Sequence, residues 1–233
     1  MQQTHEDFSD HMSLHKSGTE KRPLSHNLVR YGNKNAHSVL IQAVGDHDLP
    51  LMESEASLIK ELYGGDFLLL AFGVDDWNRD LSPWEAPAVF GNDGFEGHAG
   101  DTFARILKLC DDPGRSYYIG GYSLSGLFAL YAAYQTGVFA GVAAASPSMW
   151  FPGFIDHMRQ NKIQTDRVYL SLGDREEKTS HPVVSRVGEC IKSAKTILDA
   201  QGISCELEWN AGNHFREPDL RTAKAFARIL REN

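Results

Sequence analysis

The chain has 233 residues, of which 42% are hydrophobic, and this is enough for one sizeable core in a single folded domain. Its 31 acidic and 23 basic residues give a formal net charge of -8, which disfavours a nucleic-acid partner. The apolar runs are too short for the roughly 20 residues of a membrane helix, so we expect no membrane span. Cys110, Cys190 and Cys205 are odd in number and widely spaced, which predicts reduced thiols and neither a disulfide framework nor a zinc site.

The first 35 residues are polar and rich in His and Ser. They predict a flexible polar tail or an edge strand. Their start lacks the basic and apolar stretches of a secretion signal, so we expect a cytoplasmic protein. Residues 36–233 are expected to form one catalytic domain.

After residue 35, short apolar runs bounded by Gly, Asp and Pro alternate with longer segments of helical period. This pattern predicts an α/β fold with a mostly parallel central sheet and crossover helices. The predicted strands cover residues 38–44, 66–72, 117–120, 141–145, 167–172 and 205–209. The predicted helices cover residues 51–63, 99–110, 125–135, 154–160, 182–201 and 218–231.

The hydrophobic patterning predicts how these elements pack. Residues 67–72 contain no polar alternate positions, so this strand should be covered by helices on both faces of the sheet. The last helix is amphipathic. Its predicted buried side carries Leu220, Ala223, Phe226, Ala227 and Leu230, and its predicted exposed side carries Arg221, Lys224 and Arg228.

The most informative stretch is Gly-Tyr-Ser-Leu-Ser-Gly at residues 121–126, which lies between a predicted strand and an Ala-rich helix. A nucleophile elbow needs small residues two positions before and after its serine, because the turn is tight and strained. Gly121 and Ser125 meet this condition for Ser123. Ser125 itself would have the bulky Leu127 at the second position, so Ser123 is the predicted nucleophile.

A serine hydroxyl needs a general base, which follows it in the chain in this kind of fold. Three histidines follow Ser123. His157 is expected on a polar helix and His181 in a connecting loop, whereas His214 lies between the last strand and the last helix. A loop leaving the carboxyl end of a strand can reach the elbow, so His214 is the predicted base. The alternative is a turn histidine that caps the last helix.

The carboxylate that orients the histidine should come from the loop after the strand at residues 167–172. This loop reads Gly-Asp-Arg-Glu-Glu-Lys from residue 173. Many enzymes of this fold carry Gly-x-x-Asp there, and Gly173 as the first residue places Glu176 at the acid position. Asp174 is the second candidate and Glu177 the third. A charged, solvated loop without a catalytic role is the competing interpretation.

The loops after the other strands suggest the rest of a site. The backbone N–H of Leu124 and donors from Gly45 and Asp46 are the predicted oxyanion groups. The predicted pocket residues are His47, Trp77, Arg79 and Trp150. His47 stands between two acidic residues, but adjacent positions cannot all face one ion without a tight loop, so we expect no metal site.

Four motifs in order resemble an esterase family of α/β-hydrolases that is similar to S-formylglutathione hydrolases and enterobactin-type siderophore esterases. They are the elbow at 121–126, Asn-Arg-Asp-Leu-Ser-Pro at 78–83, Ser-Pro-Ser-Met-Trp at 146–150 and Asn213-His214. The resemblance covers the chain from about Ser38 to its end. It implies the α/β-hydrolase fold and a triad of Ser123, His214 and a carboxylate on the Gly173 loop. The chain departs from the family in having Ala43-Val44-Gly45 where His-Gly or Asp-Gly is usual, and in its short amino-terminal region.

The sequence therefore predicts a serine esterase that cleaves a small-molecule carboxylic ester through an acyl-enzyme, without a cofactor. One alternative is a catalytically silent member of the fold that binds a small molecule or a partner, because fold does not guarantee turnover. Another is a thioesterase or acyltransferase that uses the same triad. A homodimer is compatible with the sequence, and the natural substrate is not disclosed by it.

Overall fold

The computed structural model of the chain describes residues 28–231. The prediction of a flexible tail for residues 1–27 lies outside the described residues. Within the described range, residues 28–32 form the first strand at one edge of the main sheet, where they pair antiparallel with a neighbour.

The main sheet has seven strands in the order β1-β3-β2-β6-β7-β8-β9, and all its pairs except β1 with β3 are parallel. A mostly parallel sheet with crossover helices is therefore confirmed. Its strands are β1 (Leu28–Gly32), β2 (Ser38–Val44), β3 (Phe67–Gly73), β6 (Ser116–Tyr122), β7 (Phe139–Ala145), β8 (Arg167–Gly173) and β9 (Ser204–Asn210). The six strands predicted from the apolar runs are all present, with ends that differ by at most two residues.

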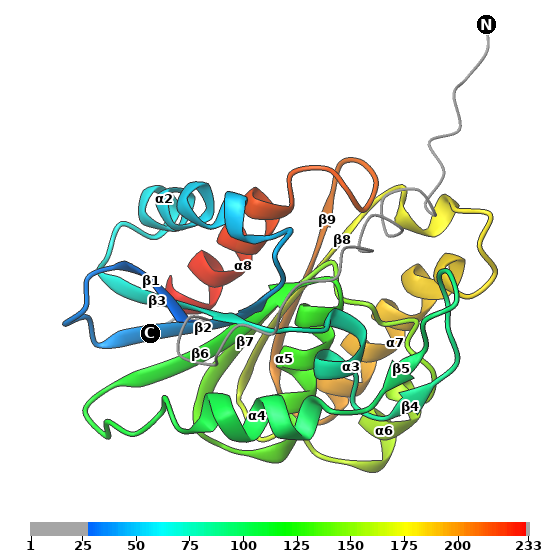
Figure 1. Ribbon diagram of the computed structural model, residues 1–233, viewed down its shortest axis with the longest axis horizontal. Helices are drawn as coiled ribbons and strands as arrows, with labels where there is room; N and C mark the ends of the chain where they lie inside the picture. Colours follow the sequence, from blue (N-terminus) through cyan, green and yellow to red (C-terminus); the bar gives the residue numbers. More distant parts are fainter. Residues whose placement is uncertain (1–27, 232–233) are drawn as a thin grey trace, which may run out of the picture.

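Helices cover both faces of the sheet (Figure 1). The α-helices are α2 (Met52–Tyr63), α3 (Trp77–Leu81), α4 (Ala99–Leu107), α5 (Leu124–Gln135), α6 (Phe154–Gln160), α7 (Val187–Ala200) and α8 (Pro218–Arg231). Short 3-10 helices are η2 (Leu49–Leu51), η3 (Glu176–Lys178) and η4 (Val184–Arg186). The predicted helix at 182–201 is thus a 3-10 turn followed by α7.

The two faces of the sheet have separate cores, because successive side chains of a strand point to opposite faces. Leu40 and Leu69 pack with α2 and α8 on one face, whereas Ile41 and Leu70 pack with α3 to α7 on the other. The continuous apolar run of β3 is buried at both sets of positions, as the patterning predicts.

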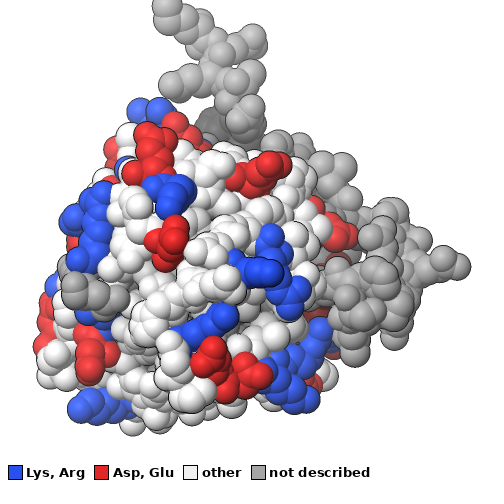
Figure 2. All heavy atoms as spheres, turned by 90° about the vertical axis from the view of Figure 1, so that its left-hand side faces the viewer, with Lys and Arg blue, Asp and Glu red and all other residues white. Residues whose placement is uncertain are grey.

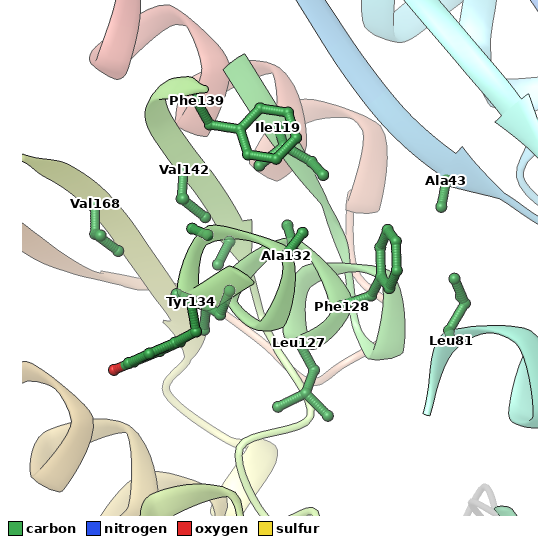
Figure 3. Packing of buried hydrophobic residues seen from close by; sticks show 14 of the residues in the cluster. Ala43, Leu81, Ile119, Leu127, Phe128, Ala132, Tyr134, Phe139, Val142 and Val168 are labelled. Atoms are coloured by element: carbon green, nitrogen blue, oxygen red, sulfur yellow. The ribbon is translucent and has the colours of Figure 1, made fainter. Parts of the chain in front are cut away.

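Helix α5 is the centre of the second core. Ten of its 12 residues are buried, and Figure 3 shows Leu127, Phe128 and Ala132 among side chains from α3 and from the strands. A helix that is buried on all sides has little freedom to shift. The residue before its first turn is therefore held firmly at the edge of the sheet.

Helix α3 and two short strands were not predicted. Helix α3 has five residues and begins where the Asp76 side chain accepts a hydrogen bond from the Arg79 backbone N–H at 2.9 Å. Strands β4 (Glu85–Ala86) and β5 (Phe95–Glu96) form a separate two-stranded ribbon. These elements are too short to show the periodicity on which sequence-based assignment relies.

None of the helices in residues 28–231 is long and apolar enough to cross a membrane. On the face of the molecule seen in Figure 2, positive and negative side chains alternate over short distances. Lys60 and Asp66 form an exposed ion pair with a distance of 3.0 Å between Nζ and Oδ1.

Gly120 tests the packing of the sheet against α8. A Cβ at this position would lie 2.6 Å from Phe226 Cζ and 2.7 Å from the Ala143 carbonyl oxygen. We therefore expect Gly120→Ala to lower the free energy of unfolding by about 1–3 kcal/mol through overpacking, as measured by chemical denaturation. Gly100→Ala is the matched control, because its Cβ meets only the Tyr131 hydroxyl at 3.8 Å and alanine favours a helix. An equal loss in both variants would contradict this explanation.

Candidate active site

Ser123 lies between β6 and α5 in a backbone conformation that L-residues rarely adopt, with φ 57° and ψ −123°. Hydrogen bonds hold this strained turn on both sides. The Ser123 N–H donates to the Ala145 carbonyl at the end of β7, and its own carbonyl accepts from the Leu127 N–H in the first turn of α5. The turn presents the serine at the carboxyl edge of the sheet, the geometry of a nucleophile elbow.

The neighbours of Ser123 explain why small residues are required. A Cβ on Gly121 would lie 2.7 Å from Ser125 Cβ and 2.9 Å from its carbonyl carbon, so only glycine fits there. Ser125 replaces the glycine that is usual at this position. Its buried hydroxyl donates a 2.7 Å hydrogen bond to the Ala43 carbonyl, which ties the elbow to the neighbouring strand β2.

His214 bridges the serine and an acid. Its Nε2 lies 3.0 Å from Ser123 Oγ, and its Nδ1 lies 2.7 Å from Glu176 Oε2. The loop that carries His214 follows β9, and the Tyr122 hydroxyl donates a 2.7 Å hydrogen bond to the His214 carbonyl. The side chain of the residue before Ser123 therefore fixes the backbone of the histidine.

Glu176 is the carboxylate that reaches the imidazole. Its other oxygen, Oε1, accepts hydrogen bonds from the Gly173 N–H at 2.7 Å and the Ser146 hydroxyl at 2.8 Å. Burial alone raises the pKa of this carboxyl group, but the charge and hydrogen bond of His214, with these two donors, outweigh burial and hold the pKa below its usual value. Glu176 is therefore ionised at neutral pH although it is only 5% exposed.

The other two acid candidates lie elsewhere. Asp174 Oδ1 accepts a 2.8 Å hydrogen bond from the Gly212 N–H, so it supports the histidine loop through the backbone. Glu177 points toward Lys192, with 4.0 Å between Oε2 and Nζ. Of the three carboxylates on the Gly173 loop, Glu176 is the one that the structure brings to His214.

Arg221 corrects one prediction from the sequence. It was placed on the exposed side of α8, but it is 2% exposed and its Nη1 lies 2.9 Å from Glu176 Oε1. The same Nη1 donates to the Tyr122 and Ser146 hydroxyls, and Nη2 donates to the Ala211 and Asn213 carbonyls. The guanidinium therefore joins the acid, the elbow strand and the histidine loop.

The prediction failed because α8 is buried over a wider arc than an amphipathic stripe. Ala225 and Ile229 lie four and eight residues after Arg221 and are both buried, so Arg221 continues an apolar row. This row is visible in the sequence and is the signal that could have identified Arg221. Lys224 is half-buried and Arg228 is exposed, as expected for the opposite side.

The predicted oxyanion donors fall into two groups. Leu124 is the first residue of α5, where backbone N–H groups lack partners within the helix. The N–H of Gly45 donates a 2.9 Å hydrogen bond to the Asp48 carboxylate, so in this conformation it is engaged within its own loop. Asp46 follows on the same loop and is exposed.

A pocket adjoins Ser123 and has an empty volume of about 560 Å³, part of it open to solvent. Trp77 and Trp150, both predicted, line it. His47 and Arg79, also predicted, do not line it: the His47 ring packs edge-on against Trp77 at 4.7 Å, and Arg79 pairs with Asp80 at 2.8 Å. The lining residues that were not among the predicted site residues are Asn78, Phe90, Phe95, Ser146, Pro147, Ser148, Val184, Val187 and Phe215.

The described residues contain no group of three or more His, Cys, Asp or Glu side chains that could hold a metal ion. Asp48 and His47 lie together, with 3.4 Å between Oδ1 and Nε2, but they form a pair without a third ligand among the described residues. The three cysteines carry free thiols.

Comparison with known proteins finds solved structures of similar fold. An IroE-like serine hydrolase from Shewanella oneidensis superposes with a TM-score of 0.71 at 14% identity, over 88% of this chain and 75% of that one. The chain has the α/β-hydrolase fold. Siderophore hydrolase EstA from Aspergillus nidulans has a TM-score of 0.59 at 17% identity, over 94% of this chain and 99% of that one.

The enterobactin esterase of Shigella flexneri has a TM-score of 0.62 at 14% identity, over 88% of this chain and 55% of that one. The solved structures thus include siderophore esterases, the proteins that the sequence motifs resemble, and the predicted fold is confirmed. No family model and no curated protein matches the chain.

Arg221 allows a test of how this fold holds its buried carboxylate. Arg221→Met keeps most of the side-chain volume but leaves the Glu176 charge without its guanidinium partner. Removing one member of a buried ion pair costs about 3–5 kcal/mol, so we expect the free energy of unfolding at neutral pH to fall by this amount in chemical denaturation.

The matched control for Arg221→Met is Arg228→Met on the same helix. Arg228 forms an exposed ion pair with Glu206, and such pairs contribute about 1 kcal/mol or less. Similar losses of unfolding free energy in the two variants would show that the buried Arg221–Glu176 pair stabilises the fold no more than an exposed ion pair does.

Proposed function

We propose that the chain is a serine hydrolase that cleaves a small-molecule carboxylic ester through an acyl-enzyme, with Ser123, His214 and Glu176 as its triad. The observation that carries this proposal is the imidazole of His214, which lies within hydrogen-bond distance of both the Ser123 hydroxyl and the Glu176 carboxylate. Three residues that are far apart in the sequence converge in the arrangement that activates a serine.

In the first half of the reaction, Ser123 Oγ attacks the ester carbonyl carbon while His214 Nε2 accepts the hydroxyl proton. Glu176 keeps the other imidazole nitrogen protonated and stabilises the imidazolium that forms. The negative charge that develops on the carbonyl oxygen is stabilised by backbone N–H groups. Leu124 supplies one of them, at the positive end of α5. Asp46 is the candidate for the second, because Gly45 is engaged with Asp48.

Collapse of the tetrahedral intermediate breaks the bond to the alcohol, which leaves with the proton from His214. In the second half, His214 removes a proton from water, and the resulting attack on the acyl-enzyme releases the acid and restores Ser123. Every proton in this sequence is carried by His214, and no step needs a cofactor.

The fold of the chain supports the proposal, since the solved structures that resemble it include proteins described as a serine hydrolase, a siderophore hydrolase and an enterobactin esterase. The strained conformation of Ser123 supports it independently, because such strain persists only where the surroundings enforce it. The elbow would have no need of this backbone geometry if it merely started a helix.

A fluorophosphonate probe tests the nucleophile. We expect it to label Ser123, with peptide mapping of the adduct by mass spectrometry as the measurement, because the probe reacts with an activated serine hydroxyl. Ser123→Ala should abolish labelling and lower kcat for activated 4-nitrophenyl esters by about 10⁴-fold or more.

Ser125→Ala is the control for Ser123→Ala, since the Ser125 hydroxyl is buried and bonded to Ala43. It should keep the labelling at Ser123. Labelling that survives Ser123→Ala would refute the proposed nucleophile, and an unlabelled, inactive wild-type protein would favour a silent binding protein. With competing alcohols or thiols, acylated product in preference to free acid would indicate a transferase.

A further inference from the structure

The enclosed part of the pocket next to Ser123 is built from aromatic and branched apolar side chains. Phe95, Val184 and Val187 line it and are 5%, 3% and 2% exposed, respectively. Trp150 and Phe90 complete this wall, which we call the aromatic wall. The wall draws on three segments: the β4–β5 ribbon, the loop after β7, and the turn that leads into α7.

The aromatic wall has a defined geometry. The rings of Phe90 and Trp150 meet at an interplanar angle of 87° with their centroids 5.8 Å apart. The centroid of the Phe95 ring lies 6.2 Å from that of Trp150. Phe95 is in turn packed edge-on against Phe151 at 5.1 Å. Rings at these distances and angles attract one another, so a further ring that enters the pocket finds faces and edges already in place.

The site has two sides that differ in exposure. The leaving alcohol must take its proton from His214 Nε2, so it departs next to this imidazole. The residue that follows the histidine, Phe215, is 44% exposed, and its ring lies 5.6 Å from the His214 ring. The leaving-group side is therefore more exposed than the part of the pocket lined by Phe95, Val184 and Val187, and this buried lining is left for the part of the ester that stays bound to Ser123.

The charges of the pocket restrict what this acyl group can be. Among the described residues that line the pocket, the ionisable ones are Glu176 and His214, and none is Lys or Arg. An acyl group that carries a carboxylate would lose its hydration at the aromatic wall without gaining a cationic partner, and it would lie near the Glu176 charge. An uncharged group meets no such penalty.

On the basis of the proposed serine hydrolase function, we propose that the aromatic wall is an acyl-binding site for an uncharged aromatic acyl group, and that Trp150 determines this specificity. Trp150 lines the pocket and offers its indole for stacking with the planar acyl group. Phe90 and Phe95 lie beside this ring, and Val184 and Val187 complete the wall.

The test compares 4-nitrophenyl esters that share one leaving group and differ in the acyl group. Each kcat/KM is divided by the rate constant for hydroxide hydrolysis of the same ester, which removes intrinsic reactivity. We expect phenylacetate to exceed acetate by about 10-fold or more and to exceed the linear hexanoate, because ring stacking adds to apolar burial. The negatively charged hemisuccinate should fall about 10-fold or more below its uncharged methyl ester.

The variants assign the preference to the wall. Trp150→Ala should bring the ratio of phenylacetate to acetate close to one, and Trp150→Phe should restore most of it. Phe90→Ala, in the loop between β4 and β5, should lower the ratio as well and provides a second test if Trp150→Ala does not fold. Trp209→Ala is the control, since Trp209 lies on β9, is 41% exposed and contacts Lys192, and it should leave the ratio unchanged.

Fluorophosphonate labelling in each variant separates this proposal from the proposed function. If wild type is labelled at Ser123 but shows a ratio near one, prefers hexanoate, or keeps its ratio in Trp150→Ala, the acyl-binding site is wrong and the hydrolase stands. If wild type is neither labelled nor active, the proposed function fails first.

Discussion

The buried carboxylate of Glu176 is the constraint on which the site depends. A carboxylate removed from water is costly unless charged and polar groups replace its hydration. Glu176 has four donors: Gly173 on its own loop, Ser146 after β7, His214 after β9 and Arg221 on α8. Three stretches of the chain, around residues 146, 173–176 and 214–221, must therefore come together before this charge is satisfied, and the same convergence places the imidazole against Ser123.

The parallel sheet makes this convergence possible. Strands β6, β7, β8 and β9 are consecutive neighbours, so their carboxyl ends form one edge on which the elbow, the Ser146 turn, the acid loop and the histidine loop follow in order. Two of these turns hold serines at positive φ, 57° for Ser123 and 42° for Ser146. Such strain is tolerated where the surrounding structure fixes the backbone, and the buried helix α5 and the Arg221 network provide that fixation.

The parallel strands before the site loops and the three residues Ser123, Glu176 and His214 could be predicted from the sequence for physical reasons. Ser123, Glu176 and His214 each follow a strand whose apolar run is long enough to recognise, and the parallel topology implied by those runs brings loops after strands to one edge. Arg221 escaped because a charged residue on a helix is normally solvated, and its partner lies 45 positions earlier. Phe90 and Phe95 of the aromatic wall escaped too, because they belong to a ribbon with strands of two residues. The Gly45 contact with Asp48 depends on a loop conformation that composition does not reveal.

Arg221 also illustrates how function and stability share one network in this fold. The guanidinium binds the acid and two carbonyls of the histidine loop. Ordering of that loop and neutralisation of the carboxylate are thus one interaction. The pocket shares Ser146, Glu176 and His214 with this network, whereas its lining residues Phe90, Phe95, Val184 and Val187 come from other elements.

The central claim is that Glu176, and no other carboxylate, orients His214 toward Ser123. Stopped-flow measurement of the acylation burst with an activated 4-nitrophenyl ester tests it most directly. Glu176→Gln should slow the burst by about 10³–10⁴-fold, because an amide cannot stabilise the imidazolium, whereas Asp174→Asn should remain within about 10-fold of wild type. A burst of normal rate in Glu176→Gln, or one that collapses in Asp174→Asn alone, would contradict the account.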